Sequence, residues 1–261
     1  GLALFLAHRY GFRLAYLLMA LIVCLGGCLY LPSAEPQVKI EPQKIGFRHA
    51  YQDIFQKNWF YYLAGLIFCI KMGEVFVANS SPMIIPFLIN GLGLDLSQIA
   101  YINNVFGLIA QLTGGAIAAI LLSRYAAFKL ILTLGGIELV SNVMFLMLSC
   151  QPHSSGLLWS SIIIENLSSG LCSTVLVALI MRVVNPQYTA TQFSFWMMFV
   201  IMPRVVAGPM GGGIYQHFGW PTVFITSSCI LSAYLFFWIK LKNNQEFIGL
   251  TKKTHDDDGL A

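Results

Sequence analysis

Long apolar runs recur along this chain, and they constrain its fold more than any other feature. Charged residues make up only 10% of the sequence and hydrophobic residues 57%, and the mean hydropathy is +0.72. An ordinary soluble domain carries about 25% charged residues. A run of about 20 apolar residues is long enough to cross the hydrocarbon core of a bilayer as an α-helix. The sequence therefore predicts an all-α integral membrane protein surrounded by the lipid bilayer.

Seven segments of the chain have the length and composition of a membrane-spanning helix. The second segment is longer than a bilayer requires, and Pro82 and Pro86 predict that its helix bends or ends early. The predicted spans are residues 12–31, 59–89, 98–122, 128–149, 157–181, 190–215 and 220–240.

Two polar segments separate or follow these spans. Residues 32–58 form a linker with three prolines and four basic residues, and residues 241–261 form a charged tail that we expect to be disordered. If the linker is cytoplasmic and the spans alternate in direction, eleven of the fifteen Lys and Arg residues fall in cytoplasmic segments. Loops rich in Lys and Arg stay on the cytoplasmic side, so we expect the linker and the tail to lie there.

Five ionisable residues lie inside predicted spans, where a charge is costly unless it is paired, hydrated or protonated. They are Lys71, Glu74, Glu138, Glu165 and Arg204. Lys71 and Glu74 are three residues apart on one helix face, so their charges compensate each other. They form either a pair that only packs the helices or a substrate or proton site. Glu138 has no base nearby in the sequence, so it is either protonated or lies near the cytoplasmic face, where its side chain snorkels outward. A structural role is slightly favoured.

Glu165 belongs to a polar stripe on one helix face, because the residues Ser161, Glu165, Ser168 and Cys172 follow each other at steps of four, three and four. Asn166 and Ser169 widen the stripe. Lipid disfavours such a face, so we expect it to line a cavity on the substrate or proton pathway. Hydrogen bonding between neighbouring helices is the alternative.

A second stripe contains Asn104, Gly107, Gln111 and Gly114. The amides of Asn104 and Gln111 can bind a sugar or an amide, and the glycines let a neighbouring helix come close. Ligand contact and plain helix packing both fit this pattern.

Arg204 follows Pro203 and precedes Pro209, and two prolines in one span predict a broken helix. An arginine keeps its charge and binds a carboxylate through two parallel hydrogen bonds. We expect its partner to be a substrate carboxylate or Glu165, while a fixed structural pair is the alternative.

Several functional classes find no support in the sequence. It contains no phosphate-binding Gly-x-x-x-x-Gly-Lys-Ser/Thr loop, no nucleophile paired with a base, and no cluster of metal ligands. The net charge of +4 follows from the basic cytoplasmic segments and requires no nucleic acid. We therefore expect neither an enzyme nor a bound cofactor or metal.

Several short motifs resemble the C-terminal half of AmpG-type muropeptide permeases of the major facilitator superfamily. They are Lys71-Met-Gly-Glu74, Glu165-Asn166, Thr189-Ala-Thr-Gln-Phe, the run from Pro203 to Gly213, and Phe218-Gly-Trp-Pro. The chain departs from the family pattern at Glu74, where the family has aspartate, and at Pro203, where it has glycine.

The resemblance implies a fold of two six-helix bundles. Residues 1–31 would then be the last helix of an N-terminal bundle whose remainder is missing, and residues 32–58 the central cytoplasmic linker. Residues 59–240 would form the C-terminal six-helix bundle, followed by the tail, residues 241–261. Alternating access requires both bundles, so we expect this piece to be inactive by itself.

The resemblance also implies a function, namely the proton-coupled import of anhydromuropeptides or related cell-wall sugars across the bacterial inner membrane. Lys71, Glu74, Glu165 and Arg204 are the site positions that it favours. Two alternatives stay open. The first is a facilitator for another anionic solute, such as acetyl-CoA, and the second is a membrane sensor that binds a ligand without transporting it.

Overall fold

The computed structural model describes residues 11–30, 47–78, 81–152 and 154–251, and the chain divides into two compact units, Gly1–Lys44 and Ile45–Ala261. Every regular element in the described ranges is a helix, so the predicted all-α membrane fold is confirmed. Residues 32–46 of the linker and 252–261 of the tail lie outside the described residues, and the expectations about them stay predictions. The expected disorder is wrong for the start of the tail, because residues 245–251 form a helix that buries Phe247. We term the described part of the second unit the C-terminal bundle.

Helix α2 (Phe12–Tyr30) is the described part of the first unit. Its 19 residues extend roughly 28 Å at 1.5 Å per residue, which is close to the thickness of a hydrocarbon core. Arg13, at its first turn, is its only charged residue. The helix therefore has the dimensions of the first predicted span.

The longest predicted span, residues 59–89, is divided into several helices in the C-terminal bundle. Helix α4 (Phe60–Val77) ends at Ala78, whose ψ angle of 144° is not helical. The chain passes Pro82 before helix α5 (Ile84–Pro86) and the π-helical turn η1 (Phe87–Gly91) follow. The predicted early end of this span is confirmed.

The next three spans follow the predicted boundaries closely. Helix α6, the π-helical segment η2 and helix α7 form one continuous path, and two long helices come after it. Their bounds are Leu96–Ile99 for α6, Ala100–Phe106 for η2, Gly107–Arg124 for α7, Ala127–Cys150 for α8 and Ser155–Val183 for α9. Ser154 caps α9, because its side chain accepts a hydrogen bond from the backbone nitrogen of Leu157.

The last apolar stretch holds two spans that meet at a glycine. The turn η3 (Pro186–Tyr188), helix α10 (Thr189–Ser232) and helix α11 (Tyr234–Lys242) together cover 57 residues. One straight helix of that length would extend roughly 85 Å, far beyond a bilayer core of about 30 Å. Gly219 divides it, with φ 78° and ψ 179°, a backbone conformation that glycine adopts without strain.

Pro203 and Pro209 do not break this helix. Both lie inside α10, and Gly219 is the one position within it that leaves helical geometry. The prediction of a broken helix at Arg204 is therefore wrong. A proline removes one backbone donor and clashes with the preceding turn, but packed neighbours and small adjustments can absorb that cost inside a membrane helix.

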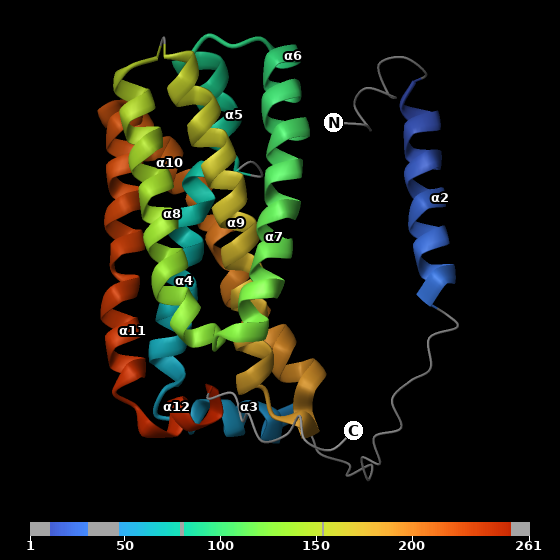
Figure 1. Ribbon diagram of the computed structural model, residues 1–261, viewed down its shortest axis with the longest axis vertical. Coiled ribbons are helices and arrows are strands. Elements are labelled where there is room, and N and C mark those ends of the chain that lie inside the picture. The colour runs from blue at the N-terminus through green and yellow to red at the C-terminus, as the bar shows by residue number, and fades with distance from the viewer. Residues whose placement is uncertain (1–10, 31–46, 79–80, 153, 252–261) are drawn as a thin grey trace. The chain divides into compact units, whose positions relative to one another are not determined.

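Two short helices, α3 (Phe47–Phe55) and α12 (Gln245–Thr251), lie across one end of the bundle (Figure 1). Asp53 on α3 accepts a hydrogen bond of 3.0 Å from Gln192 at the start of α10. Lys57 pairs with Glu246 at 3.4 Å.

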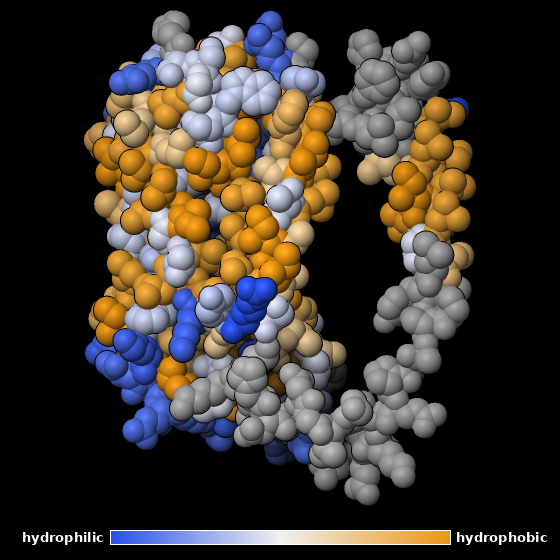
Figure 2. Space-filling view, viewed as in Figure 1, coloured by the Kyte–Doolittle hydropathy of each residue, from blue (hydrophilic) through white to orange (hydrophobic). Residues whose placement is uncertain are grey.

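Hydrophilic side chains gather toward the ends of this bundle, while apolar side chains cover much of its length (Figure 2). That distribution fits a bundle whose sides face lipid.

Glycines bring α7 and α9 into close contact, and this pair makes the most extensive helix contact of the bundle. A methyl group added at Gly114 would collide with the backbone oxygen of Leu167, and one added at Gly170 would collide with that of Gln111. Small residues commonly mediate such close approach in membranes, where no hydrophobic force drives helices together.

We expect Gly170→Ala to lower the free energy of unfolding of the protein by about 1–3 kcal/mol, the usual cost of overpacking a tight contact. The clash is with backbone, which cannot rotate away as a side chain would. Gly136→Ala on α8 is the matched control, because nothing lies within 4 Å of the added methyl group there. Denaturant titration in mixed micelles measures both, and equal stability of the two variants would contradict the prediction.

Candidate functional site

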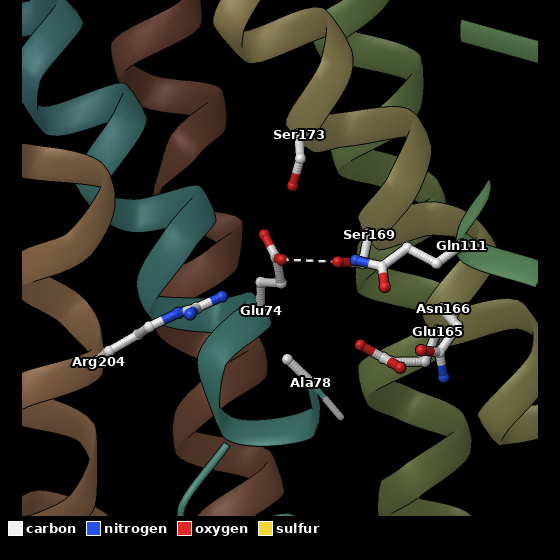
Figure 3. A pocket seen from close by; sticks show the side chains of 8 residues that line it. All are labelled: Glu74, Ala78, Gln111, Glu165, Asn166, Ser169, Ser173 and Arg204. Atoms are coloured by element: carbon white, nitrogen blue, oxygen red, sulfur yellow. Dashed lines mark hydrogen bonds between the residues drawn. The ribbon is translucent and has the colours of Figure 1, made fainter. Parts of the chain in front are cut away.

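Polar side chains from four helices line a cavity of about 340 Å³ inside the C-terminal bundle (Figure 3). They come from α4, α7, α9 and α10, so the cavity joins segments that are far apart in the sequence. We term it the polar cavity. Its lining residues are Glu74, Ala78, Gln111, Glu165, Asn166, Ser169, Ser173 and Arg204.

A buried ion pair contributes Glu74 to the lining of the polar cavity. Lys71 and Glu74 bind each other within α4 and are 5% and 4% exposed. Lys71 Nζ also donates to Ser173 Oγ at 2.8 Å, and Glu74 Oε1 accepts a hydrogen bond from Ser169 Oγ at 2.7 Å. Each member of the pair is therefore tied to α9, and the two opposite charges enter the bundle as a neutral unit.

Glu165 faces the same cavity with less support. Its side chain is 1% exposed, and no described residue forms a hydrogen bond with its Oε1 atom. Neighbouring Asn166 is also buried and donates to the backbone oxygen of Ile162 at 2.8 Å. A buried carboxyl oxygen without a partner is costly, and such groups in native proteins call for a bound water, a ligand or a proton.

Arg204 reaches the cavity from the opposite side, on α10 (Figure 3). Its side chain is exposed, and no ion pair joins it to a carboxylate within the described residues. The expected pair with Glu165 therefore does not form in this structure. The guanidinium is available to an anion that enters the cavity.

A second cavity of about 280 Å³ lies against the same ion pair, and we term it the cationic cavity. It shares Glu74, Ser173 and Arg204 with the polar cavity and adds Lys71. Its other lining residues are apolar, namely Val75, Leu176, Val177, Met197, Val200 and Ile201. The two cavities thus differ in chemistry: acids, amides and hydroxyls dominate the first, while two cations and an apolar wall characterise the second.

The stripe predicted on α9 lines the polar cavity only in part. Glu165 and the two residues expected to widen the stripe, Asn166 and Ser169, line the cavity. Ser161, Ser168 and Cys172 are buried but do not line it. The prediction missed Ser173, although its position four residues after Ser169 places it on the same helix face.

The stripe predicted on the 98–122 span is half correct. Gln111 lines the polar cavity, whereas Asn104 does not. Gly107 and Gly114 serve packing, because each lies against α9. The side chain of Asn166 would be the first contact of a methyl group at Gly107, at 3.0 Å. Close approach of the two helices is therefore what brings Gln111 to the cavity.

Glu138 departs most from expectation. Of the two expectations for this residue, snorkelling toward the cytoplasmic face is wrong, because it is 0% exposed. Protonation stays a prediction. The side chain of Glu138 accepts a hydrogen bond of 2.6 Å from Ser168 Oγ. The sequence offered no sign of this contact, since the two residues are thirty positions apart and lie on different helices.

Sequence comparison identifies the family of the chain. Two segments, residues 1–200 and 75–255, match the family described as the Major Facilitator Superfamily, and together they cover nearly the whole chain. The chain belongs to the major facilitator superfamily. Facilitators of this superfamily are built from two halves related by an axis along the membrane normal, with binding sites near the bilayer midplane.

Several curated facilitators are similar to this chain. The anhydromuropeptide permease of Escherichia coli K12 is 29% identical over 232 residues, which are 87% of this chain and 46% of the permease. A protein named AmpG 3 from Rickettsia typhi is 25% identical over 262 residues, 96% of this chain and 62% of that relative. The chain thus spans about half the length of the permease. The predicted resemblance to AmpG-type proteins is confirmed.

Because the ion pair on α4 is buried, we expect the loss of one partner to change the stability of the protein. We expect Glu74→Gln to lower the free energy of unfolding by about 3–5 kcal/mol, because it leaves the charge of Lys71 buried and unbalanced. Replacing both residues with methionine should recover most of that loss, since no charge is then buried. Denaturant titration of the protein in mixed micelles measures all three variants.

Glu246→Gln is the matched control for this series. It breaks the pair with Lys57, whose side chains are 37% and 45% exposed, and such pairs contribute under about 1 kcal/mol. A Glu74→Gln variant no less stable than the Glu246→Gln variant would contradict the prediction.

Proposed function

We propose that this chain is part of a secondary transporter that imports anhydromuropeptides across the bacterial inner membrane together with protons. The proposal concerns a whole protein in which the C-terminal bundle works with an N-terminal bundle, since the chain spans about half of the permease from Escherichia coli. The transporter binds and releases its substrate without making or breaking a covalent bond. The name of that relative and the chemistry of the two cavities support the proposal.

One observation supports this function most directly: two cavities of different chemistry share the lining residues Glu74, Ser173 and Arg204. A muropeptide has two matching parts, a sugar with hydroxyl and acetamido groups and a peptide with carboxylates. The amides of Gln111 and Asn166 suit the sugar, because they both donate and accept hydrogen bonds. The guanidinium of Arg204 suits the peptide carboxylates, because it binds them through two parallel hydrogen bonds.

Glu165 is the group that we propose for proton coupling. Glu74 already has Lys71 and Ser169 as partners, so its charge is balanced. Glu165 lines the same cavity, yet one of its oxygens has no hydrogen-bond partner within the described residues. A carboxyl that lines a polar cavity and has no ion-pair partner among the described residues can take up and release a proton as the site opens to either face.

We expect Glu165→Gln in the full-length parent to abolish proton-driven accumulation of labelled anhydromuropeptide, because the amide cannot exchange a proton. Membrane vesicles with and without an imposed proton gradient provide the measurement, and the wild-type protein should accumulate substrate only with the gradient. Glu246→Gln at the bundle end is the control and should accumulate substrate normally. Normal accumulation by Glu165→Gln would contradict the role of that residue.

The same assay tests the substrate class. Wild-type vesicles that hold folded protein but take up no anhydromuropeptide under any gradient would contradict the proposed substrate. Uptake of acetyl-CoA in its place would favour the alternative anion carrier, and binding without uptake would favour a sensor.

We also propose that the end of the bundle covered by α3 and α12 faces the cytoplasm. Arg124, Lys129, Arg182 and Lys240 lie toward that end, as the charge rule for membrane proteins requires. Lys129 and Cys150 lie near opposite ends of α8 and are both exposed, so one helix supplies two reporters.

In a full-length protein whose other cysteines are replaced, we expect a membrane-impermeant maleimide to label Cys150 in intact cells. A Lys129→Cys variant that also carries Cys150→Ser should be labelled only after the cells are opened. The reverse pattern would contradict the proposed orientation.

A further inference from the structure

Glu138 is a buried carboxyl that belongs to neither cavity. It lies in the middle of α8, its side chain is 0% exposed, and it is absent from the lining of both cavities. Its Oε2 atom accepts a hydrogen bond of 2.6 Å from Ser168 Oγ, and no described residue forms a hydrogen bond with its Oε1 atom. A buried carboxylate normally has several donors around it, so this environment is poor for a charge.

The hydroxyl of Ser168 cannot satisfy all of its neighbours at once if Glu138 is charged. Ser168 Oγ lies 2.6 Å from Glu138 Oε2 and 3.0 Å from the backbone oxygen of Glu165, and both are acceptors. A hydroxyl carries only one hydrogen. If Glu138 is protonated on Oε2, its own hydrogen goes to Ser168 Oγ, and the hydrogen of Ser168 goes to the oxygen of Glu165. The neutral carboxyl therefore fits both short distances.

A polar network connects Glu138 to the helix that carries the ion pair. Asn142 Nδ2 donates to the backbone oxygen of Glu138 at 3.1 Å. The side chain of Asn142 also binds Ser227 Oγ, which lies 2.9 Å from the backbone oxygen of Gly73, next to Glu74. Ser141, also on α8, is fully buried and has no hydrogen-bond partner for its Oγ atom within the described residues. The backbone of Glu138 thus joins contacts between α8, α10 and α4, while its carboxyl contacts α9.

The charges around Glu138 do not balance it. The helices α4, α9, α10 and α11 pack against α8. Lys71 and Glu74 on α4, Glu165 and Cys172 on α9 and Tyr234 on α11 are the titratable groups on three of them. Helix α10 carries Arg204, Tyr215, His217 and Cys229, and its Arg204 lines the polar cavity, from which Glu138 is absent. Lys71 already binds Glu74, and no ion pair joins Glu138 or Glu165 to a cation within the described residues.

We propose that Glu138 is a second proton-binding site of the bundle, outside the substrate cavities, and that Ser168 reports its state by turning its hydrogen between Glu138 and the backbone of Glu165. Binding one H⁺ from the aqueous phase converts the carboxylate to a neutral carboxyl, and release returns that H⁺. The number of protons that the bundle can exchange is then two, one at Glu165 and one at Glu138. This inference does not depend on which solute is carried.

Infrared difference spectroscopy of the full-length parent in lipid tests the proposal without any substrate. As the pH is stepped, protonated carboxyl groups give their own stretching band in the difference spectrum. We expect the wild-type band to contain one component that Glu165→Gln removes and another that Glu138→Gln removes. Glutamine has the shape of the neutral acid and can donate to Ser168 Oγ, so we expect the variant to fold.

Two further variants make the test decisive. Ser168→Ala should shift the frequency of the Glu138 component, because it removes the only hydrogen-bond partner that this side chain has among the described residues. It also provides the test if Glu138→Gln does not fold. Glu246→Gln should leave both carboxyl components in place. A pH-dependent band unchanged by Glu138→Gln, or unshifted by Ser168→Ala, would overturn the proposal. Failure of muropeptide uptake alone would not, because the spectrum is recorded without solute.

Discussion

The ion pair between Lys71 and Glu74 is the interaction on which the site depends. A charge at the centre of a membrane helix costs roughly 2.5–3.5 kcal/mol on insertion scales. Pairing two opposite charges three residues apart on α4 offsets part of that cost before any other helix is involved. Ser169 and Ser173 then bind the pair from α9, which fixes the two helices against each other. Both cavities lie against this fixed pair.

Close packing of α7 on α9 completes the polar cavity. Without a hydrophobic force between helices in lipid, contact depends on shape, and glycine allows the closest approach. Gly114 and Gly170 meet backbone atoms of the opposite helix, and this contact carries Gln111 to the cavity edge. On the other side of the cavity, α10 remains helical through Pro203 and Pro209, and its Arg204 lines the cavity. The arrangement leaves Glu165 facing the cavity with no cation bound to it.

The sequence predicted the fold well because the bilayer imposes a simple rule of length and polarity. The spans, the pair on α4 and the interruption before Pro82 all follow from residues close together in the chain. The site was predicted only in part. Helical spacing placed Glu165, Asn166 and Gln111 at a cavity, but the predicted stripe also contained residues on an adjacent face of α9 that do not line it. The contact between Glu138 and Ser168 depends on how α8 and α9 pack, which no local pattern encodes.

The central claim is that the region around the ion pair binds the substrate. A structure of the full-length parent with a bound anhydromuropeptide tests it most directly. The account predicts the sugar beside Gln111, Asn166 and Glu165 and a peptide carboxylate on Arg204. A muropeptide bound away from both cavities, or bound in the reverse direction with its peptide toward Glu165, would contradict the account.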